Sequence, residues 1–478
     1  MKQYTKQFIG GEWREGTGDA VLQDYNPATG ELLFEYRSAS RADVDAAYAA
    51  AQAAQPAWAA TPPAAKRKLL LKLAEVVEAY HDELISIFIE EAGSASHKYG
   101  FEFGGALDEI AQATHYPYMM DGTIMPSDIP GKENYIWRSP KGVILTIAPF
   151  NFPFLLAMRS VVPAVATGNT VVLKPASDTP ASAFVIGELF EQAGFPPGVI
   201  NVIAGRGSDI GDYIVTHPVP ALVSFTGSTE VGGHIGALAT GMIKDVSLEL
   251  GGNNTMIILD DADVQQACAA AVFGAYCHQG QVCMALNRII CLPGVYEQVV
   301  ETFTAMAASL PVGRTDDPNI FVGPIINASQ ADKIEALIAK TIEEGATVSL
   351  RGHRDGPFIS PWVLSDVTNG MTAAKQECFG PVVCIMRAAD EDEAIAIAND
   401  TEYGLSNSVF TRDLYHGMQV ARRMESGMVH VNDQSINDES HVMFGGEKRS
   451  GVGRFNARWV VGKFTTEKWI SVQVEPRF

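Results

Sequence analysis

Short apolar runs alternate with helical patterns through the middle of the chain. Residues 143–148, 170–174 and 221–225 are apolar runs of strand length, while residues 154–166 and 181–193 carry apolar side chains at three- and four-residue spacing. Strands that alternate with helices in this way predict right-handed crossovers and a parallel, doubly wound sheet. Ligands of such sheets bind beyond the carboxyl ends of the strands, so a site is expected there.

A second alternating series runs from residue 256 to residue 433. Its strand candidates are residues 288–292, 381–386, 407–411 and 428–432. Because 478 residues are too many for one core, the series predicts a second α/β domain. A cleft between two α/β domains is a common place for a small-molecule site.

Two strand-like stretches stand apart from both series. Residues 134–138 and 469–474 alternate apolar and polar side chains, although more than 300 residues separate them. They are expected to pair with each other and to project, which leaves an edge for another subunit. An ordinary edge ribbon within one chain is the alternative.

Composition excludes several classes of partner. The net charge is −21, from 35 basic and 56 acidic side chains, which argues against nucleic acid and against an anionic membrane surface. The uncharged run 142–158 contains two prolines and is short for a membrane span, and the first residues lack the apolar core of a secretory signal. None of the six cysteines lies before residue 268 and none forms a CxxC pair, so neither disulfides nor a metal site are expected and a cytoplasmic location is predicted.

One carboxylate and one thiol stand beside glycines near the domain junction. Glu249 precedes Gly251-Gly252, and Cys283 ends the segment Gly280-Gln281-Val282-Cys283. Glycine lets backbone or ligand approach closely, and a reactive cysteine needs both room for a substrate and a base. The alternative is a glutamate that contacts a loop and a small, inert core cysteine.

Three further motifs follow predicted strands. Gly227 and Ser228 lie in a strand–turn–helix segment that presents backbone N–H groups to a phosphate, although a simple helix cap explains the same pattern. Lys174 ends a strand, where it can reach a ribose or a phosphate, or stand as a solvated charge. Asn151 lies between Pro149 and Pro153, which suits an oxyanion hole or, alternatively, a helix cap.

Taken in order, these motifs resemble the NAD(P)-dependent aldehyde dehydrogenase superfamily over nearly the whole chain. The matching segments are Pro149-Phe150-Asn151-Phe152-Pro153, Lys174-Pro175, Phe225-Thr226-Gly227-Ser228, Glu249-Leu250-Gly251-Gly252, Gly280-Gln281-Val282-Cys283, Glu377-Cys378-Phe379-Gly380-Pro381 and Phe444-Gly445-Gly446. The resemblance implies a Rossmann-like cofactor domain (1–118 and 141–250), a catalytic domain (251–445) and an antiparallel oligomerisation ribbon (119–140 and 462–478). It also implies a homodimer or homotetramer.

The same resemblance implies a role for each motif. Cys283 matches the nucleophile, Glu249 the general base and Asn151 the oxyanion amide. The expected contacts to the cofactor, NAD with NADP also accepted, are Phe150, Lys174, Ser177, Gly227, Ser228, Glu377 and Phe379. Ser177 stands where NAD-preferring members often carry a glutamate, which is why NADP is expected to fit.

Two segments narrow the resemblance to one branch. Residues 158–164 and 437–446 resemble benzaldehyde and vanillin dehydrogenases, which implies oxidation of an aromatic aldehyde. Phe150, Phe152 and Phe154 are expected to cluster beside Asn151 and to favour a planar ring. The alternative is a succinic or other aliphatic semialdehyde, whose acid group Arg159 would bind. A CoA-acylating enzyme is a further alternative, and the presence of Glu249 argues against it. A non-catalytic protein of the same fold is another, and the complete set of motifs argues against that.

Two departures concern the substrate side. Met443 replaces the usual proline before Phe-Gly-Gly, which is expected to reshape the substrate mouth. Phe455 follows Gly453-Arg454 where many members carry a glutamate, so a second carboxylate near the water path is not expected.

Overall fold

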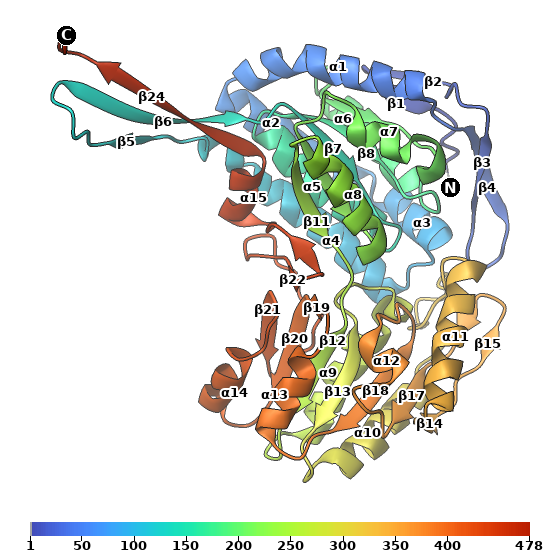
Figure 1. The fold of residues 1–478 in the computed structure, drawn as a ribbon. Coiled ribbons are helices and arrows are strands. Elements are labelled where there is room, and N and C mark those ends of the chain that lie inside the picture. The colour runs from blue at the N-terminus through green and yellow to red at the C-terminus, as the bar shows by residue number, and fades with distance from the viewer. Residues whose placement is uncertain (1) are drawn as a thin grey trace.

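The chain forms two large sheets whose central strands are parallel. The computed structural model, in which residues 2–478 are described, has one sheet above a cleft and one below it, with a ribbon that projects from the upper domain (Figure 1). The upper sheet has the order β2-β1-β9-β8-β7-β10-β11-β23. Its strands are β1 (Gln7–Ile9), β2 (Glu12–Arg14), β7 (Val143–Ile147), β8 (Thr170–Lys174), β9 (Ile200–Val202), β10 (Leu222–Thr226), β11 (Asp245–Glu249) and β23 (Gly451–Val452).

Helices cover both faces of the upper sheet, which explains why its central strands β7, β8 and β10 are mostly apolar on both faces. Val143 and Leu145 pack on one face with Val44 and Tyr48, whereas Ile144 packs on the other with Phe154. This is the period-two alternation of a strand that is buried on both sides. The covering helices are α1 (Arg41–Ala60), α7 (Asp212–Thr216) and α8 (Thr229–Gly241) on one face, and α2 (Pro63–Ala79), α3 (His81–Ala92), α4 (Ser96–Ala113), α5 (Pro153–Ala166) and α6 (Ala181–Ala193) on the other.

The lower sheet repeats the plan. Its order is β14-β17-β18-β13-β12-β20-β21. The strands are β12 (Asn254–Ile258), β13 (Leu286–Cys291), β14 (Thr347–Leu350), β17 (Trp362–Ser365), β18 (Val382–Arg387), β20 (Ser406–Phe410) and β21 (Met428–Val431); α9 (Val264–Tyr276) and α10 (Tyr296–Ala308) pack on one face, and α11 (Ala328–Glu343), α12 (Thr372–Lys375), α13 (Glu391–Asn399) and α14 (Leu414–Ala421) on the other. The predicted pair of doubly wound α/β domains is therefore confirmed.

The chain crosses between the domains at one short segment and later returns. β11 ends at Glu249 and β12 begins at Asn254, so four residues join the two sheets. Near the C-terminus β23 pairs with β11, with Gly451 opposite Glu249, and α15 (Ala457–Lys463) follows. The domain boundaries given above stay a prediction; the pairing places residues 451–452 in the upper sheet.

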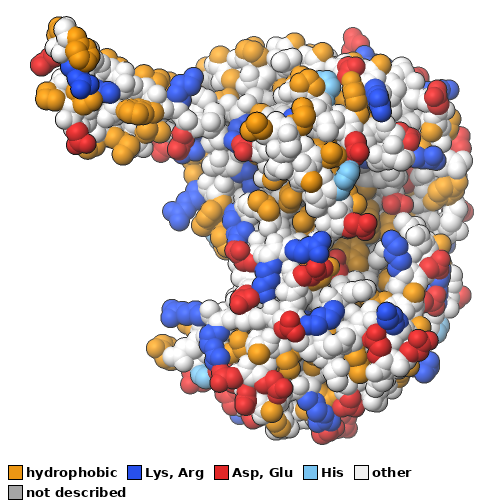
Figure 2. Space-filling view, viewed as in Figure 1, with side chains coloured by type: hydrophobic (Ala, Val, Ile, Leu, Met, Phe, Trp, Pro, Cys, Tyr) orange, Lys and Arg blue, Asp and Glu red, His pale blue; other side chains and the backbone are white. Residues whose placement is uncertain are grey.

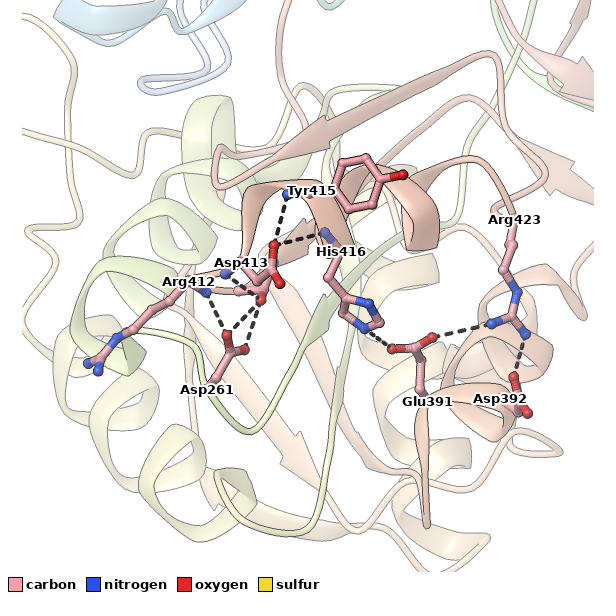
Figure 3. A network of polar contacts seen from close by, with 9 residues as sticks. Asp261, Glu391, Asp392, Arg412, Asp413, Tyr415, His416 and Arg423 are labelled. Carbon is pink, nitrogen blue, oxygen red and sulfur yellow. Dashed lines mark hydrogen bonds and ion pairs between the residues drawn. The ribbon is translucent and has the colours of Figure 1, made fainter.

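A polar network fixes the outer layer of the lower domain (Figure 3). Asp413 caps α14, and His416 on this helix lies 2.5 Å from Glu391 of α13. Arg423 bonds the same glutamate at 3.2 Å and Asp392 at 2.5 Å. Since α13 and α14 lie on the side away from the cleft in Figure 1, this cluster of charges holds two helices together and takes no part in the site.

The two distant strands pair as predicted. β6 (Lys132–Pro140) runs antiparallel to β24 (Thr465–Gln473) over nine residues, and β5 (Thr123–Met125) adds a third strand that the sequence pattern had not indicated. The ribbon projects from the upper domain and carries exposed hydrophobic side chains, among them Trp137 and Trp469 at 61% and 64% exposure (Figures 1 and 2). None of the helices within residues 2–478 is long and apolar enough to cross a membrane.

Candidate active site

A cavity of about 970 Å³ lies between the domains, where Figure 2 shows the face hollowed. Its size is at the upper end of ordinary small-molecule sites. All ten predicted site residues line it: Phe150, Asn151, Lys174, Ser177, Gly227, Ser228, Glu249, Cys283, Glu377 and Phe379. Residues from six separate segments therefore converge on one place.

The loop before Cys283 is held in an unusual backbone conformation. His278, Gln279 and Gly280 have φ of 49°, 57° and 71°, a left-handed run that costs energy for the two non-glycine residues. A Cβ at residue 280 would overlap the carbonyl oxygen of Gly380. Gln279 anchors the loop, because it accepts from Gly323 N at 2.9 Å and donates to Pro324 O at 2.8 Å. These contacts hold the loop, and with it the Cys283 thiol, in one position at the cavity.

Two glycines bring the carboxylate and the thiol together. A Cβ at Gly252 would overlap the carbonyl oxygen of Cys283, and one at Gly251 would overlap the carboxylate of Glu377. Asn254 completes the junction by donating its amide to the carbonyl oxygens of Cys283 and Ala285, both at 2.8 Å. The glycines beside Glu249 are therefore required by close approach.

Glu249 is a buried carboxylate without a partner. Its side chain is 2% exposed, and neither carboxylate oxygen has a hydrogen-bond partner among the described residues. Burial raises its pKa to about 7, although Arg159 and Lys463 act in the opposite direction. A carboxylate with a pKa near neutrality suits a general base.

Asn151 faces the nucleophile loop and does not cap the helix after it. Its side-chain amide donates to the carbonyl oxygen of Gln281 at 2.9 Å, which leaves a second N–H. The start of α5 is capped instead by Glu102 from α4, which accepts from Phe154 N at 2.9 Å and Leu155 N at 3.2 Å. The helix-cap alternative for Asn151 is therefore wrong.

The Cys283 thiol is half-buried in apolar surroundings. Burial raises its pKa to about 12, while the guanidinium of Arg159 opposes the shift and the carboxylates of Glu377 and Glu249 add to it. At neutral pH the thiol therefore holds its proton, and attack on a substrate requires a base to take that proton.

The upper part of the cavity has the chemistry of a dinucleotide site. The Ser228 hydroxyl caps α8 through Val231 N at 3.4 Å, as the alternative interpretation held, yet the capped end also lines the cavity. Lys174 is buried, donates to Pro175 O at 3.0 Å, and has its pKa lowered by burial to about 8. A helix N-terminus and a lysine suit phosphates, so these residues fit the expected cofactor.

Two residues from the lower domain close this part of the cavity. Phe379 has a φ of 47°, a strained conformation for an aromatic residue, and its ring meets Phe150 edge to face at 5.7 Å. Glu377 accepts from Gly252 N at 3.0 Å, and burial raises its pKa to about 7. Phe379 is thereby held against the upper domain, and Glu377 against the segment that joins the two sheets.

Arg159 is already neutralised. Its side chain is 2% exposed, bonds Asp438 at 2.9 Å, and its guanidinium carbon lies 4.1 Å from the Phe444 ring centroid and 5.1 Å from that of Phe455. A buried arginine with a carboxylate partner and two aromatic faces offers no free charge to a substrate.

The expected cluster of three phenylalanines does not form. Phe150 lines the cofactor side of the cavity, Phe152 contacts Phe101 at 6.0 Å, and Phe154 packs on Phe88 at 5.5 Å. The helix begins at Pro153, so residues two positions apart no longer share a face and the rings diverge.

A family model for aldehyde dehydrogenases matches residues 13–470. This chain belongs to the aldehyde dehydrogenase family. A benzaldehyde dehydrogenase of Bacillus subtilis (strain 168) is 46% identical over 477 residues, or 100% of this chain and 98% of the relative. A vanillin dehydrogenase of Corynebacterium glutamicum is 45% identical over 472 residues, 98% of both chains. The crystal structure of a NAD-dependent benzaldehyde dehydrogenase from Corynebacterium glutamicum has a TM-score of 0.91 at 42% identity and covers 98% of this chain and 99% of its own.

These comparisons confirm the resemblance stated from the motifs, at the level of the family and of the branch. Sequence reasoning missed three residues that shape this aldehyde dehydrogenase site: Glu102, Asn254 and Asp438. Asn254 stands within the Gly251-Gly252-Asn253-Asn254 motif, so its place was visible. Glu102 and Asp438 act across 52 and 279 residues, and no local pattern marks such partners.

Proposed function

We propose that this aldehyde dehydrogenase oxidises an aromatic aldehyde to the carboxylic acid with NAD. The observation that carries the proposal is the meeting of a thiol, an unpartnered carboxylate and a fixed amide at the base of one dinucleotide-sized cavity. The names of the similar proteins, a benzaldehyde and a vanillin dehydrogenase, support the choice of substrate class.

In the proposed mechanism Cys283 gives up its proton to solvent water, and the thiolate attacks the aldehyde carbon. The second N–H of Asn151 and the backbone N–H of Cys283 bind the oxyanion of the resulting thiohemiacetal. Lys174 and Ser228 in the upper cavity would hold a nicotinamide cofactor, which when bound would accept the hydride of the thiohemiacetal and so leave a thioester on Cys283. Glu249 then removes a proton from water, and the hydroxide displaces the thiolate to release the acid.

The surroundings of the thiol favour an aromatic over a semialdehyde substrate. Cys283 packs against the large apolar cluster that contains Phe152, Ile436 and Phe444. Arg159, the cation that the semialdehyde alternative would use, is already paired with Asp438 and does not offer a free charge to a second carboxylate. A buried charge without a partner costs several kcal/mol, so the semialdehyde is expected to bind poorly.

The substrate class is tested by comparing kcat/KM for benzaldehyde and succinic semialdehyde. Benzaldehyde is expected to be preferred at least tenfold. A preference for the semialdehyde that disappears in Arg159→Leu would refute the aromatic assignment and place the acid group on this arginine.

The base is tested with Glu249→Gln. Rapid mixing of the variant with NAD and aldehyde is expected to give a burst of NADH followed by slow turnover, because a neutral amide cannot activate water for deacylation. Loss of the burst as well would assign Glu249 to an earlier step, the deprotonation of Cys283. Turnover equal to that of the parent would remove Glu249 from the mechanism.

We also propose that the ribbon of β5, β6 and β24 joins subunits of a homodimer or homotetramer in the cytoplasm. Its length, its exposed tryptophans and the unpaired edge of β24 within the described residues support an interface. Six free cysteines support a reducing compartment. Light scattering of Trp137→Glu and Trp469→Glu variants checks the assembly: smaller particles are expected, and an unchanged mass would refute the interface.

A further inference from the structure

Buried polar atoms without partners gather on one face of β11. Ser247 and Glu249 are two residues apart on this strand and so point to the same side. The hydroxyl of Ser247, both carboxylate oxygens of Glu249 and the amine of Lys463, the last residue of α15, are all buried without a hydrogen-bond partner among residues 2–478. Buried polar groups are nearly always satisfied, so this group of atoms calls for bound water.

The glycines beside these atoms locate the amine. A Cβ on Gly453 would lie 3.6 Å from both Lys463 Nζ and Ser247 Oγ, and a Cβ on Gly445 would lie 3.1 Å from Glu249 Oε1. The amine therefore approaches the strand at Ser247, on the face from which the Glu249 carboxylate projects.

Three cations act on Glu249, and two of them are already paired. Arg159 bonds Asp438 at 2.9 Å. Arg454 forms an ion pair with Glu447 and also donates to the carbonyl oxygens of Gly446 and Gly453. Lys463 has no carboxylate partner within 4 Å among residues 2–478, so its charge is the one left to answer Glu249.

The surroundings of Lys463 both oppose and support its charge. Burial lowers the pKa of its amine well below the usual value, whereas ionised Glu249 raises it. Lys463 Nζ also lies 3.1 Å from the centroid of the Phe455 ring, a position that favours the ammonium form. The ionised form of Glu249 therefore favours the ammonium form of Lys463, and the reverse also holds, so the two groups titrate as a coupled pair.

We propose that Lys463 is a positioning residue for the hydrolytic step, acting as the counter-charge that keeps Glu249 ionised through water held between the two side chains and Ser247. The inference rests on the proposed role of Glu249 as the base. No bond to the substrate is formed by Lys463; the proton taken from the hydrolytic water goes to Glu249, and the ammonium stabilises the carboxylate that accepts it.

The pH dependence of this pair depends on every charged group that faces it. Without Lys463 the pKa of Glu249 is expected to rise, so the carboxylate would form only at higher pH. The other groups would stay in place. They are Arg159 from α5, Arg454 from the segment after β23, Asp438 from the loop before Phe444, and Cys283 from the nucleophile loop.

The test is a rapid-quench measurement of acyl-enzyme decay against pH in the full-length enzyme with NAD and benzaldehyde. Lys463→Met keeps the length of the side chain and removes the charge, and Lys463→Gln keeps a polar end. Both are expected to slow decay about fivefold at pH 7 and to move its acid limb upward by about one pH unit, with the NADH burst within twofold of the parent. Lys68→Met, on the exposed side of α2, is the matched control and should follow the parent profile.

A decay profile of Lys463→Met and Lys463→Gln that superimposes on the parent profile would overturn the inference, even if thermal stability changes. A burst that falls in step with decay would overturn it too, because the amine would then act on the thiol. Glu249→Gln separates the two proposals. If this variant decays at the parent rate, the base assignment fails; if it is blocked while Lys463→Met is normal, only the counter-charge fails.

Discussion

The buried ion pair between Lys98 and Glu102 offers a prediction with a calculable size. Both side chains are completely buried, and the Lys98 amine lies 4.8 Å from the Phe152 ring centroid. Glu102→Gln keeps an oxygen for the N–H groups of Phe154 and Leu155 but removes the partner of the lysine. Burial already lowers the pKa of Lys98, and Glu102 is the group that raises it most.

The magnitude follows from the choice left to an unpartnered lysine. In the variant Lys98 either stays charged, at a cost of about 3–5 kcal/mol for a broken buried pair, or gives up its proton. Deprotonating an amine whose ordinary pKa is about 10.5 at pH 7 costs about 3.5 × 1.36, or about 5 kcal/mol, which sets a ceiling. We expect a loss of 3–5 kcal/mol, or about 3–5 °C in Tm, because the unfolding entropy of a chain of 478 residues is about 1 kcal/mol/K.

The sign of the pH dependence is fixed by linkage. With Lys98 neutral in the folded variant and protonated in the unfolded chain, the unfolded state binds one more proton, so stability rises with pH. The deficit against the parent should be full at pH 7, shrink by about 1.4 kcal/mol per pH unit above the folded pKa, and vanish near pH 10.5.

Thermal unfolding of parent and variant between pH 7 and pH 10 measures this directly. The double variant Lys98→Met with Glu102→Gln is the matched control, since methionine fits among Phe88 and Phe152 and the glutamine still caps α5. It should recover most of the loss. A single variant within 1 kcal/mol of the parent, or a double variant as unstable as the single, would refute the reasoning.

Three further expectations concern the catalytic residues. Cys283→Ala should abolish turnover by at least a thousandfold while NAD still binds, as fluorescence titration would report; near-normal activity would end its assignment as nucleophile. Ser177→Glu should lower the NADP-to-NAD ratio of kcat/KM tenfold or more, because a carboxylate repels a 2′-phosphate, and an unchanged ratio would show that this position does not set the preference. Because burial raises the pKa of Glu249 to about 7, acyl-enzyme decay should increase as pH rises from 6 to 8 and then level off; a flat profile would contradict a base with that pKa.

The sequence predicted the sheets and the site well for a physical reason. Strands buried on both faces are mostly apolar, and glycines at close approaches tolerate no side chain, so both leave local marks such as those at residues 143–148 and at Gly251-Gly252. The ten residues expected from the motifs and from the family resemblance line one cavity.

What the sequence did not predict depends on partners distant along the chain. Arg159 was a candidate for an acid group because its partner, Asp438, is 279 residues away, and the motif 437–446 that contains Asp438 does not indicate which side chain it pairs with. The sequence predicted that the three phenylalanines near Asn151 cluster, because it did not indicate at which residue α5 begins. The helix begins at Pro153, and the change from strand to helix spacing there points the three rings in different directions. The burial of the Lys463 amine could not be predicted, because a lysine at the end of a helix is usually exposed and nothing in the local sequence distinguishes this one.

The contact between residue 252 and the Cys283 carbonyl sets limits on how this enzyme can diverge. The space between them admits a hydrogen atom and nothing larger, and the same holds between residue 280 and Gly380. The segment 433–443, in contrast, reaches the site from a separate part of the chain and holds Arg159 through one ion pair. Substitutions that change specificity, in nature or in laboratory evolution, should therefore accumulate in that segment. Gly252 and Gly280, which bring the segments of Glu249 and Cys283 close to their neighbours, should stay unchanged.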